Sequence, residues 1–132
     1  RSRCCVPEPM ITRILAAKGE AACIVPVLPV TDTLYRGETP LEREGVRMIQ
    51  TPQLSVTKTL RKALETTQLF TDESSAVAAA GARVHFVEGS PHAHKLTTLA
   101  DLQKLPCIEA ASQKTLTGFG LDIHPFEAGK PM

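Results

Sequence analysis

The longest apolar run of the chain, residues 21–30, sets the first limit on its possible folds. The run is about half as long as a membrane-spanning helix and contains Pro26 and Pro29, so we expect no transmembrane helix there. Its continuous, β-branched segment at residues 22–27 is typical of a strand buried on both faces. The sequence therefore predicts a buried strand at this position.

Helical and strand patterns alternate along the rest of the chain. Strands are predicted at residues 22–27, 31–36, 46–49, 83–87, 94–97 and 116–123, and helices at residues 7–18, 55–66, 72–80 and from 98 to about 104. Such alternation is typical of a layered α/β domain with a largely parallel sheet.

Three local features refine this prediction. Residues 30–50 are predicted to form a two-stranded arm, in which residues 31–36 and 46–49 flank a polar tip. Ser55 and Thr71 are the expected N-caps of two helices. Thr98 opens a capping box in which Asp101 replaces the usual Glu.

Length and charge exclude several classes of protein. The chain has 132 residues, 42% hydrophobic and 22% charged, which is the composition of one globular domain. Fifteen Lys and Arg against fourteen Asp and Glu leave a net charge of +1, so we expect neither nucleic acid nor a membrane as a partner. Arg1 is no initiator, and residues 118–132 begin a new pattern, so we expect a segment of a longer protein.

The cysteines show no metal or redox motif. Cys4, Cys5, Cys23 and Cys107 lack C-x-x-C spacing, and adjacent cysteines rarely bridge each other because the joining peptide is strained. We expect reduced thiols in a cytoplasmic protein.

Two groups of polar residues are candidates for chemistry. Lys95 follows a predicted strand and turn, where it could hold a phosphate or simply be solvated. Asp122 and His124 point to the same side of a predicted strand, as two ligands of a metal ion would. His92 and His94 are either an H-x-H metal pair or exposed loop histidines, and a zinc site formed by all four of these residues remains a separate hypothesis.

Polar groups also occur at three junctions between elements, at residues 31–33, 51–53 and 71–73. Capping and turn formation would explain each junction separately. Three junctions at the ends of strands favour a site for sugar hydroxyls and phosphate, because ligands of α/β sheets bind outside those ends. No glycine-rich phosphate loop is present in the sequence.

The junction motifs, taken in order, resemble the methylerythritol phosphate cytidylyltransferase family of the non-mevalonate isoprenoid pathway. The matching segments are Pro29-Val30-Thr31-Asp32-Thr33-Leu34, Gln50-Thr51-Pro52-Gln53, Phe70-Thr71-Asp72-Glu73-Ser74-Ser75, Val87-Glu88-Gly89 and Lys95-Leu96-Thr97. The resemblance covers about residues 3–105, which correspond to the C-terminal half of the family. The segment at residues 117–126 resembles the first strand of the methylerythritol cyclodiphosphate synthase family, which some bacteria fuse behind the cytidylyltransferase.

The resemblance implies a Rossmann-like nucleotidyltransferase sheet with a protruding β-arm at about residues 30–50 that joins two subunits. It implies a reaction of CTP with methylerythritol 4-phosphate, assisted by Mg²⁺, that gives diphosphocytidyl-methylerythritol and pyrophosphate. The implied catalytic residues are Lys95 and Arg43, the latter acting in the partner subunit's site, and the implied substrate-binding residues are Thr33, Thr51, Thr71 and Arg3.

The resemblance also divides the chain into a cytidylyltransferase part at residues 1–105, a linker at 106–115 and the start of a synthase part at 116–132. Asp122 and His124 match two ligands of the synthase metal, Zn²⁺ or another divalent ion. Because the glycine-rich CTP loop of the family is missing, we expect the chain to be inactive alone. The alternative is a non-catalytic module for dimerisation or sugar-phosphate binding.

Overall fold

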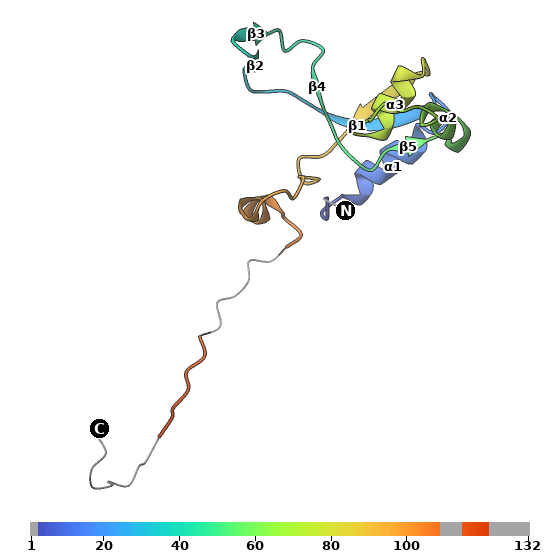
Figure 1. The fold of residues 1–132 in the computed structure, drawn as a ribbon. Coiled ribbons are helices and arrows are strands. Elements are labelled where there is room, and N and C mark those ends of the chain that lie inside the picture. Colours follow the sequence, from blue (N-terminus) through green and yellow to red (C-terminus); the bar gives the residue numbers. More distant parts are fainter. Residues whose placement is uncertain (1–2, 109–114, 122–132) are drawn as a thin grey trace, which may run out of the picture.

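The computed structural model describes residues 3–108 and 115–121 of the chain (Figure 1). In chain order the elements are α1 (Glu8–Ala16), β1 (Cys23–Pro29), β2 (Leu34–Arg36), β3 (Thr39–Leu41), β4 (Arg47–Ile49), β5 (Leu54–Ser55), α2 (Thr57–Ala63), α3 (Glu73–Ala79), β6 (Val84–Glu88) and the 3₁₀ helix η1 (Leu99–Lys104). This order confirms the predicted α/β class. No helix within the described ranges is long and apolar enough to cross a membrane.

The predicted strand at residues 22–27 is β1, at the centre of a four-stranded sheet. β6 pairs in parallel with the first five residues of β1. β4 and β5 pair antiparallel with the two ends of β1, along the edge opposite β6. The prediction of a largely parallel sheet is therefore wrong for the described residues, since two of the three pairings of β1 are antiparallel. The arm returns the chain to β4, and a short connection leads from β4 to β5, so neither antiparallel pairing needs a crossover helix.

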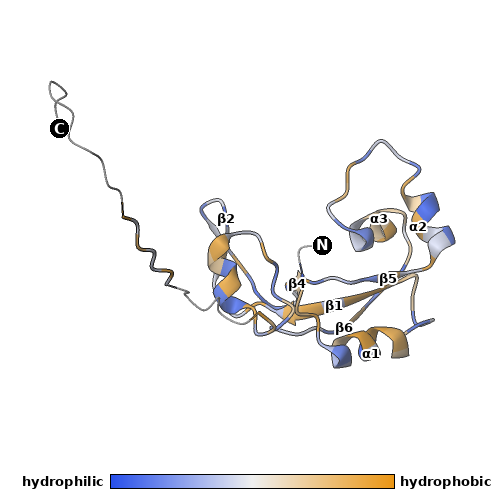
Figure 2. Cartoon of the chain, turned by 90° about the horizontal axis from the view of Figure 1, so that it is seen from below, coloured by the Kyte–Doolittle hydropathy of each residue, from blue (hydrophilic) through white to orange (hydrophobic). Residues whose placement is uncertain are grey.

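Helices cover both faces of this sheet (Figure 2). On one face Met10 and Ile14 of α1 pack with Ile24 of β1 and with Ala93, all buried. On the other face Val77 of α3 packs against the neighbouring residues of β1, which are Cys23, Val25 and Val27. Successive side chains of a strand point to opposite faces, so β1 must be apolar at every position. This explains the continuous apolar run from which the strand was predicted.

The arm at residues 30–50 is present, but its strands pair differently from the prediction. β2 pairs with β3 in a small hairpin at the tip, where Gly37 has a positive φ of 61°. β4 pairs with β1 and not with residues 31–36. The hairpin lies away from the main sheet (Figure 1). The alternation of polar and apolar residues indicated strands correctly, but it carries no information on which strand is the partner.

The N-caps predicted at Ser55 and Thr71 are both wrong, because each observed cap is the following residue. Ser55 belongs to β5, and its hydroxyl donates to Glu73 and contacts Cys23. The N-cap of α2 is Val56. For α3 the cap is Asp72 and not Thr71, because the Asp72 carboxylate accepts the amide of Ser75. Thr71 and Asp72 are both good capping residues, so the sequence alone could not choose between them, whereas Val56 has no side chain that can cap a helix.

The strands predicted at residues 94–97 and 116–123 are not found. Residues 94–97 pair with no strand in the described part of the chain, and the Thr97 amide bonds instead to the Asp101 carboxylate. Residues 116–121 have no regular secondary structure, and Leu116 and Phe119 are at least 90% exposed. The last two residues of that prediction lie outside the described ranges. The capping box of Thr98 and Asp101 is confirmed, and it opens η1.

The expectation that every cysteine is reduced is wrong for one pair. Cys5 and Cys107 form a disulfide, with their Cα atoms 5.4 Å apart and 102 positions between them in sequence. Cys4 and Cys23 are free, and burial raises the pKa of the Cys23 thiol. Sequence spacing could not reveal the pair, because the fold alone brings residue 107 back to the segment before α1.

Candidate active site

Segments that are far apart in sequence meet at an open cleft of about 380 Å³. They are the segment before α1, the end of β4 with the connection to β5, the start of α3, and the loop after β6. The lining residues are Arg3, Ile49, Thr51, Gln53, Thr71, Asp72, Ser75 and Lys95. Four predicted site residues, Arg3, Thr51, Thr71 and Lys95, thus lie around one cavity.

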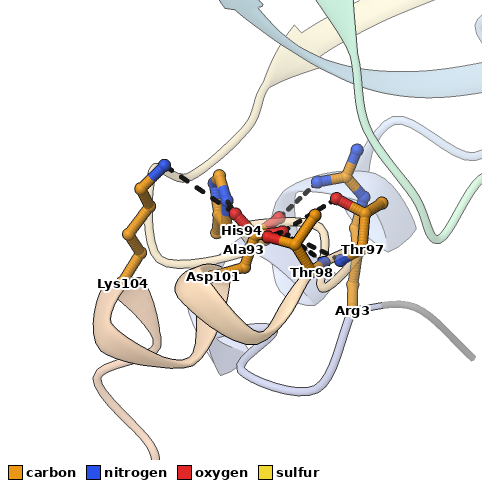
Figure 3. A network of polar contacts seen from close by, with 7 residues as sticks. All are labelled: Arg3, Ala93, His94, Thr97, Thr98, Asp101 and Lys104. Atoms are coloured by element: carbon orange, nitrogen blue, oxygen red, sulfur yellow. Dashed lines mark hydrogen bonds and ion pairs between the residues drawn. The ribbon is translucent and has the colours of Figure 1, made fainter.

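Arg3 is held against two of these segments. Its guanidinium donates to the carbonyl of Ala93 (Figure 3) and, at 3.3 Å, to the carbonyl of Ile49. Partial burial lowers the pKa of Arg3, although an arginine keeps its charge at any physiological pH. Two of its five donors are used by these carbonyls, so the cation retains donors for a ligand.

Asp72 joins several other residues of the cleft wall through hydrogen bonds. Its carboxylate accepts from Gln53 Nε2 at 2.7 Å, from the Ser74 hydroxyl, and from the amide and hydroxyl of Ser75. Burial raises the pKa of Asp72, but the bonds from Gln53, Ser74 and Ser75 together outweigh it, so the pKa is lowered. Gln53 also accepts the Ser74 amide, which ties the connection after β4 to the start of α3. Thr51 and Thr71, which also line the cleft, lie close in sequence to Gln53 and Asp72 of this network.

Gln50 joins β4 to the loop after β6. It is 3% exposed, and its side-chain amide donates to the Ser90 carbonyl at 2.8 Å and accepts the Ser90 amide at 2.9 Å. Its backbone amide bonds to Pro26 of β1. These bonds fix the start of the loop that carries Lys95 beside the segment that carries Thr51.

The loop around Lys95 is also fixed from its far side, as Figure 3 shows. The carboxylate of Asp101 accepts the amides of Thr97 and Thr98 at 3.0 and 2.9 Å and both of their hydroxyls. His94 Nε2 lies 3.0 Å from the other carboxylate oxygen. The bond with His94, followed by those from Thr97 and Thr98, holds the pKa of Asp101 far below its usual value.

Other predicted site residues lie elsewhere. Thr33 and Arg43 belong to the exposed arm and do not line the cleft, and Arg43 donates to the carbonyl of Thr31. Asp122 and His124 are outside the described residues, so their metal role stays a prediction.

The histidine pair shows no metal site in the described part of the chain. His94 is bonded to Asp101, and His92 is exposed. The group of potential metal ligands found in that part consists of Cys4, Cys5 and Cys107, two of which form the disulfide.

Sequence reasoning gave Gln53, Asp72 and Ser75 no individual role in the site, although the structure places them in the wall of the cleft. A signal was present, because all three stand in or beside the polar junctions at residues 51–53 and 71–73. Their neighbours were chosen because threonines matched a family motif, whereas these residues could equally serve as caps and turns.

The chemistry of the cleft suits an anionic, hydroxylated ligand. Arg3 and Lys95 supply two positive charges against one negative charge among the lining residues, that of Asp72, whose oxygens already accept hydrogen bonds from Gln53 and Ser75. Arginine and lysine bind phosphate by directed hydrogen bonds and by charge, respectively. Threonine hydroxyls add neutral donors and acceptors for sugar hydroxyls.

Comparison with known proteins gives a consistent result. The family model for 2-C-methyl-D-erythritol 4-phosphate cytidylyltransferase matches residues 1–108. The bifunctional enzyme IspD/IspF of Sulfurovum sp. (strain NBC37-1) is 76% identical over 131 residues, which are 99% of this chain and 35% of that protein. The chain therefore spans about a third of the length of the curated relatives it matches.

Solved structures share the fold. The bifunctional IspDF of Campylobacter jejuni matches with a TM-score of 0.76 and 44% identity, over 80% of this chain and 28% of that chain. The 2-C-methyl-D-erythritol 4-phosphate cytidylyltransferase of Thermus thermophilus matches with a TM-score of 0.69 and 36% identity, over 77% of this chain and 55% of that one.

Proposed function

Because this chain belongs to the 2-C-methyl-D-erythritol 4-phosphate cytidylyltransferase family, we propose that its cleft is the sugar-phosphate half of a cytidylyltransferase active site. The complete enzyme would join CTP to 2-C-methyl-D-erythritol 4-phosphate and release pyrophosphate. The observation that carries this proposal is the meeting of Arg3, Thr51, Thr71 and Lys95 around one cavity.

In the proposed reaction a phosphate oxygen of methylerythritol phosphate attacks the α-phosphorus of CTP. The new P–O bond forms as the bond between the α-phosphorus and the bridging oxygen breaks, and pyrophosphate carries away the electron pair. Negative charge accumulates on the phosphoryl oxygens, so positioned cations are the main contribution that a protein can make. Lys95 and Arg3 would supply those cations, while Thr51 and Thr71 orient the substrate.

The described residues do not fit the Mg²⁺ that the family implies. Magnesium prefers several oxygen ligands in octahedral geometry. Asp72 is the only carboxylate among the lining residues, and its oxygens already accept from Gln53, Ser74 and Ser75. We therefore propose Mg²⁺ only for the longer enzyme, whose further residues would have to supply its ligands.

We also propose a homodimer in which the arm at residues 30–50 of one subunit carries Arg43 to the substrate phosphate of the other. The β2–β3 hairpin is largely exposed and lies away from the main sheet, which supports this role (Figure 1). We further propose that the enzyme is cytoplasmic and is fused to a cyclodiphosphate synthase. Asp122 and His124 would bind the divalent metal of that synthase. The names of the bifunctional relatives support that fusion.

A hybrid enzyme tests the function. The 131 matched residues of the Sulfurovum enzyme are replaced by this chain, and CTP-dependent pyrophosphate release is measured with methylerythritol 4-phosphate. We expect an active hybrid, in which Lys95→Ala lowers kcat by about 10²-fold or more because it removes a charge that stabilises the transition state. The 132-residue chain alone is expected to release none.

Two outcomes would contradict the proposal. An inactive but folded hybrid would favour the non-catalytic module, and binding of methylerythritol 4-phosphate without turnover would identify it as a sugar-phosphate binder. An unchanged kcat/KM in Lys95→Ala would remove the assigned role of that residue. For the dimer, mixing Arg43→Ala and Lys95→Ala hybrids should restore part of the activity, since one site of the mixed dimer then has both intact residues.

A further inference from the structure

The loop that carries Lys95 belongs to no helix or strand. On its N-terminal side Ala93 is fully buried in the core, and its carbonyl accepts from Arg3. On its C-terminal side the chain enters η1. A lysine in such a loop can occupy a defined position only if both sides of the loop are fixed.

Asp101 fixes the second side. Its carboxylate is almost buried, with the residue 7% exposed, and it contacts His94 before Lys95 and Thr97 and Thr98 after it (Figure 3). Residues on both sides of Lys95 therefore contact a single carboxylate, and Lys95 itself lines the cleft.

Helix capping explains only part of this arrangement. A capping box needs the bond from the Thr98 amide to Asp101. The bonds from the amide and hydroxyl of Thr97 and the contact with His94 lie outside the capping box. These additional bonds all attach to the two sides of Lys95.

We propose that Asp101 is a positioning residue that holds Lys95 at the cleft by binding the backbone and side chains on both sides of it. The proposal rests on the proposed function of the cleft. A carboxylate suits this task because each of its two oxygens accepts several bonds, whereas an asparagine has one oxygen. In Asp101→Asn the one remaining oxygen can accept from Thr97 and Thr98 only while the new NH2 group faces His94, where it keeps a bond only if His94 Nε2 accepts it. The negative charge that strengthens all of these bonds is lost in either case.

The kinetic test uses the hybrid enzyme described above. Displacing a catalytic group by about 1 Å can reduce turnover by about 10²-fold, so we expect Asp101→Asn to lower kcat by about 10- to 100-fold with little change in KM. Thr97→Val, which removes one hydroxyl donor and keeps the shape, should give a smaller decrease. Lys104→Ala is the matched control, since it removes the exposed ammonium 3.7 Å from Asp101 and should change kcat by less than about twofold.

A double-mutant cycle separates positioning from general structural damage. If Asp101 acts through Lys95, then Asp101→Asn lowers kcat by less than about twofold when Lys95 is already alanine. The same fold decrease in both backgrounds would overturn the proposal, as would an unchanged kcat in Asp101→Asn.

The 132-residue chain gives a test that does not depend on the proposed reaction. In Asp101→Asn the Thr97 amide should exchange with solvent about tenfold faster, and the NMR order parameter at Lys95 should fall, with the rest of the spectrum retained. An unchanged order parameter at Lys95 would overturn the proposal even if the hybrid is inactive. An inactive hybrid with the expected loss of order would instead refute the reaction and leave Asp101 as the residue that orders this loop.

Discussion

Replacing Gly89 by alanine should disrupt the contact that joins β4 to the loop after β6. A Cβ atom at this position would lie 2.1 Å from Gln50 Oε1 and 3.0 Å from the carbonyl oxygen of Val27. The second contact could relax by a few tenths of an ångström, but the first is impossible. The Gln50 side chain must therefore leave its buried site.

The cost follows from the bonds that Gln50 makes. Moving its amide breaks the bonds at 2.8 and 2.9 Å to the carbonyl and amide of Ser90. Each bond is worth about 1 kcal/mol net, and a backbone group left buried without a partner adds about 1–3 kcal/mol. We expect Gly89→Ala to lower the free energy of unfolding by about 2–5 kcal/mol.

Urea unfolding of the 132-residue chain, followed by circular dichroism, measures this effect. Gly118→Ala is the control, because nothing lies within 4 Å of a Cβ atom there, and it should change stability by less than about 0.5 kcal/mol. In the double variant with Gln50→Ala the two losses should sum to less than their separate values, since both remove the same bonds. Additive losses, or a Gly89→Ala chain as stable as the control, would refute the reasoning.

Three further perturbations have defined outcomes. Reducing the Cys5–Cys107 disulfide, or replacing Cys5 by serine, should lower the free energy of unfolding by up to about 4.7 kcal/mol, because the bond closes a loop of about 100 residues. Thermal melting with and without dithiothreitol measures this loss, and identical melting curves would contradict the prediction. Met10→Ala should cost about 2–5 kcal/mol in urea unfolding, whereas Leu15→Ala on the same helix, 57% exposed, should cost far less. The pKa of Asp72 is lower in the folded than in the unfolded chain, so its contribution to stability is complete above about pH 4 and is lost as the pH falls through the folded pKa. Asp72→Asn should therefore remove this part of the decrease of Tm at acid pH. A variant whose Tm depends on pH as that of the original chain does would refute the prediction.

Sequence patterns predicted those elements whose burial is visible in the chain itself. β1 was predictable because both of its faces are apolar, and α1 and β6 because their periodicity is regular. The partner of β4 was not, since pairing with β1 depends on a register between residues about 20 positions apart. The disulfide has the same origin, because the distance between Cys5 and Cys107 is set by the whole fold.

The site was predicted through family motifs rather than through periodicity. Motif residues such as Thr51 and Lys95 meet at one cleft, but the motifs did not reveal the residues that hold them there. Gln50 and Asp101 act through backbone groups of distant or neighbouring segments, and such contacts leave no periodic trace in a sequence. For Asp101 the capping box was visible, whereas the bonds to His94 and Thr97 required coordinates.

The residues that line the cleft come from distant parts of the sequence, and this affects how a ligand stabilises the fold. The lining residues come from segments between Arg3 and Lys95, so the site exists only while the sheet and helices that hold these segments together are folded. A ligand that binds there is therefore linked to the global unfolding equilibrium and not to a local loop. At a hundred times its dissociation constant such a ligand adds about 2.7 kcal/mol to the stability of the whole chain. Melting curves recorded with candidate sugar phosphates would thus report occupancy of the cleft even where no turnover can be observed.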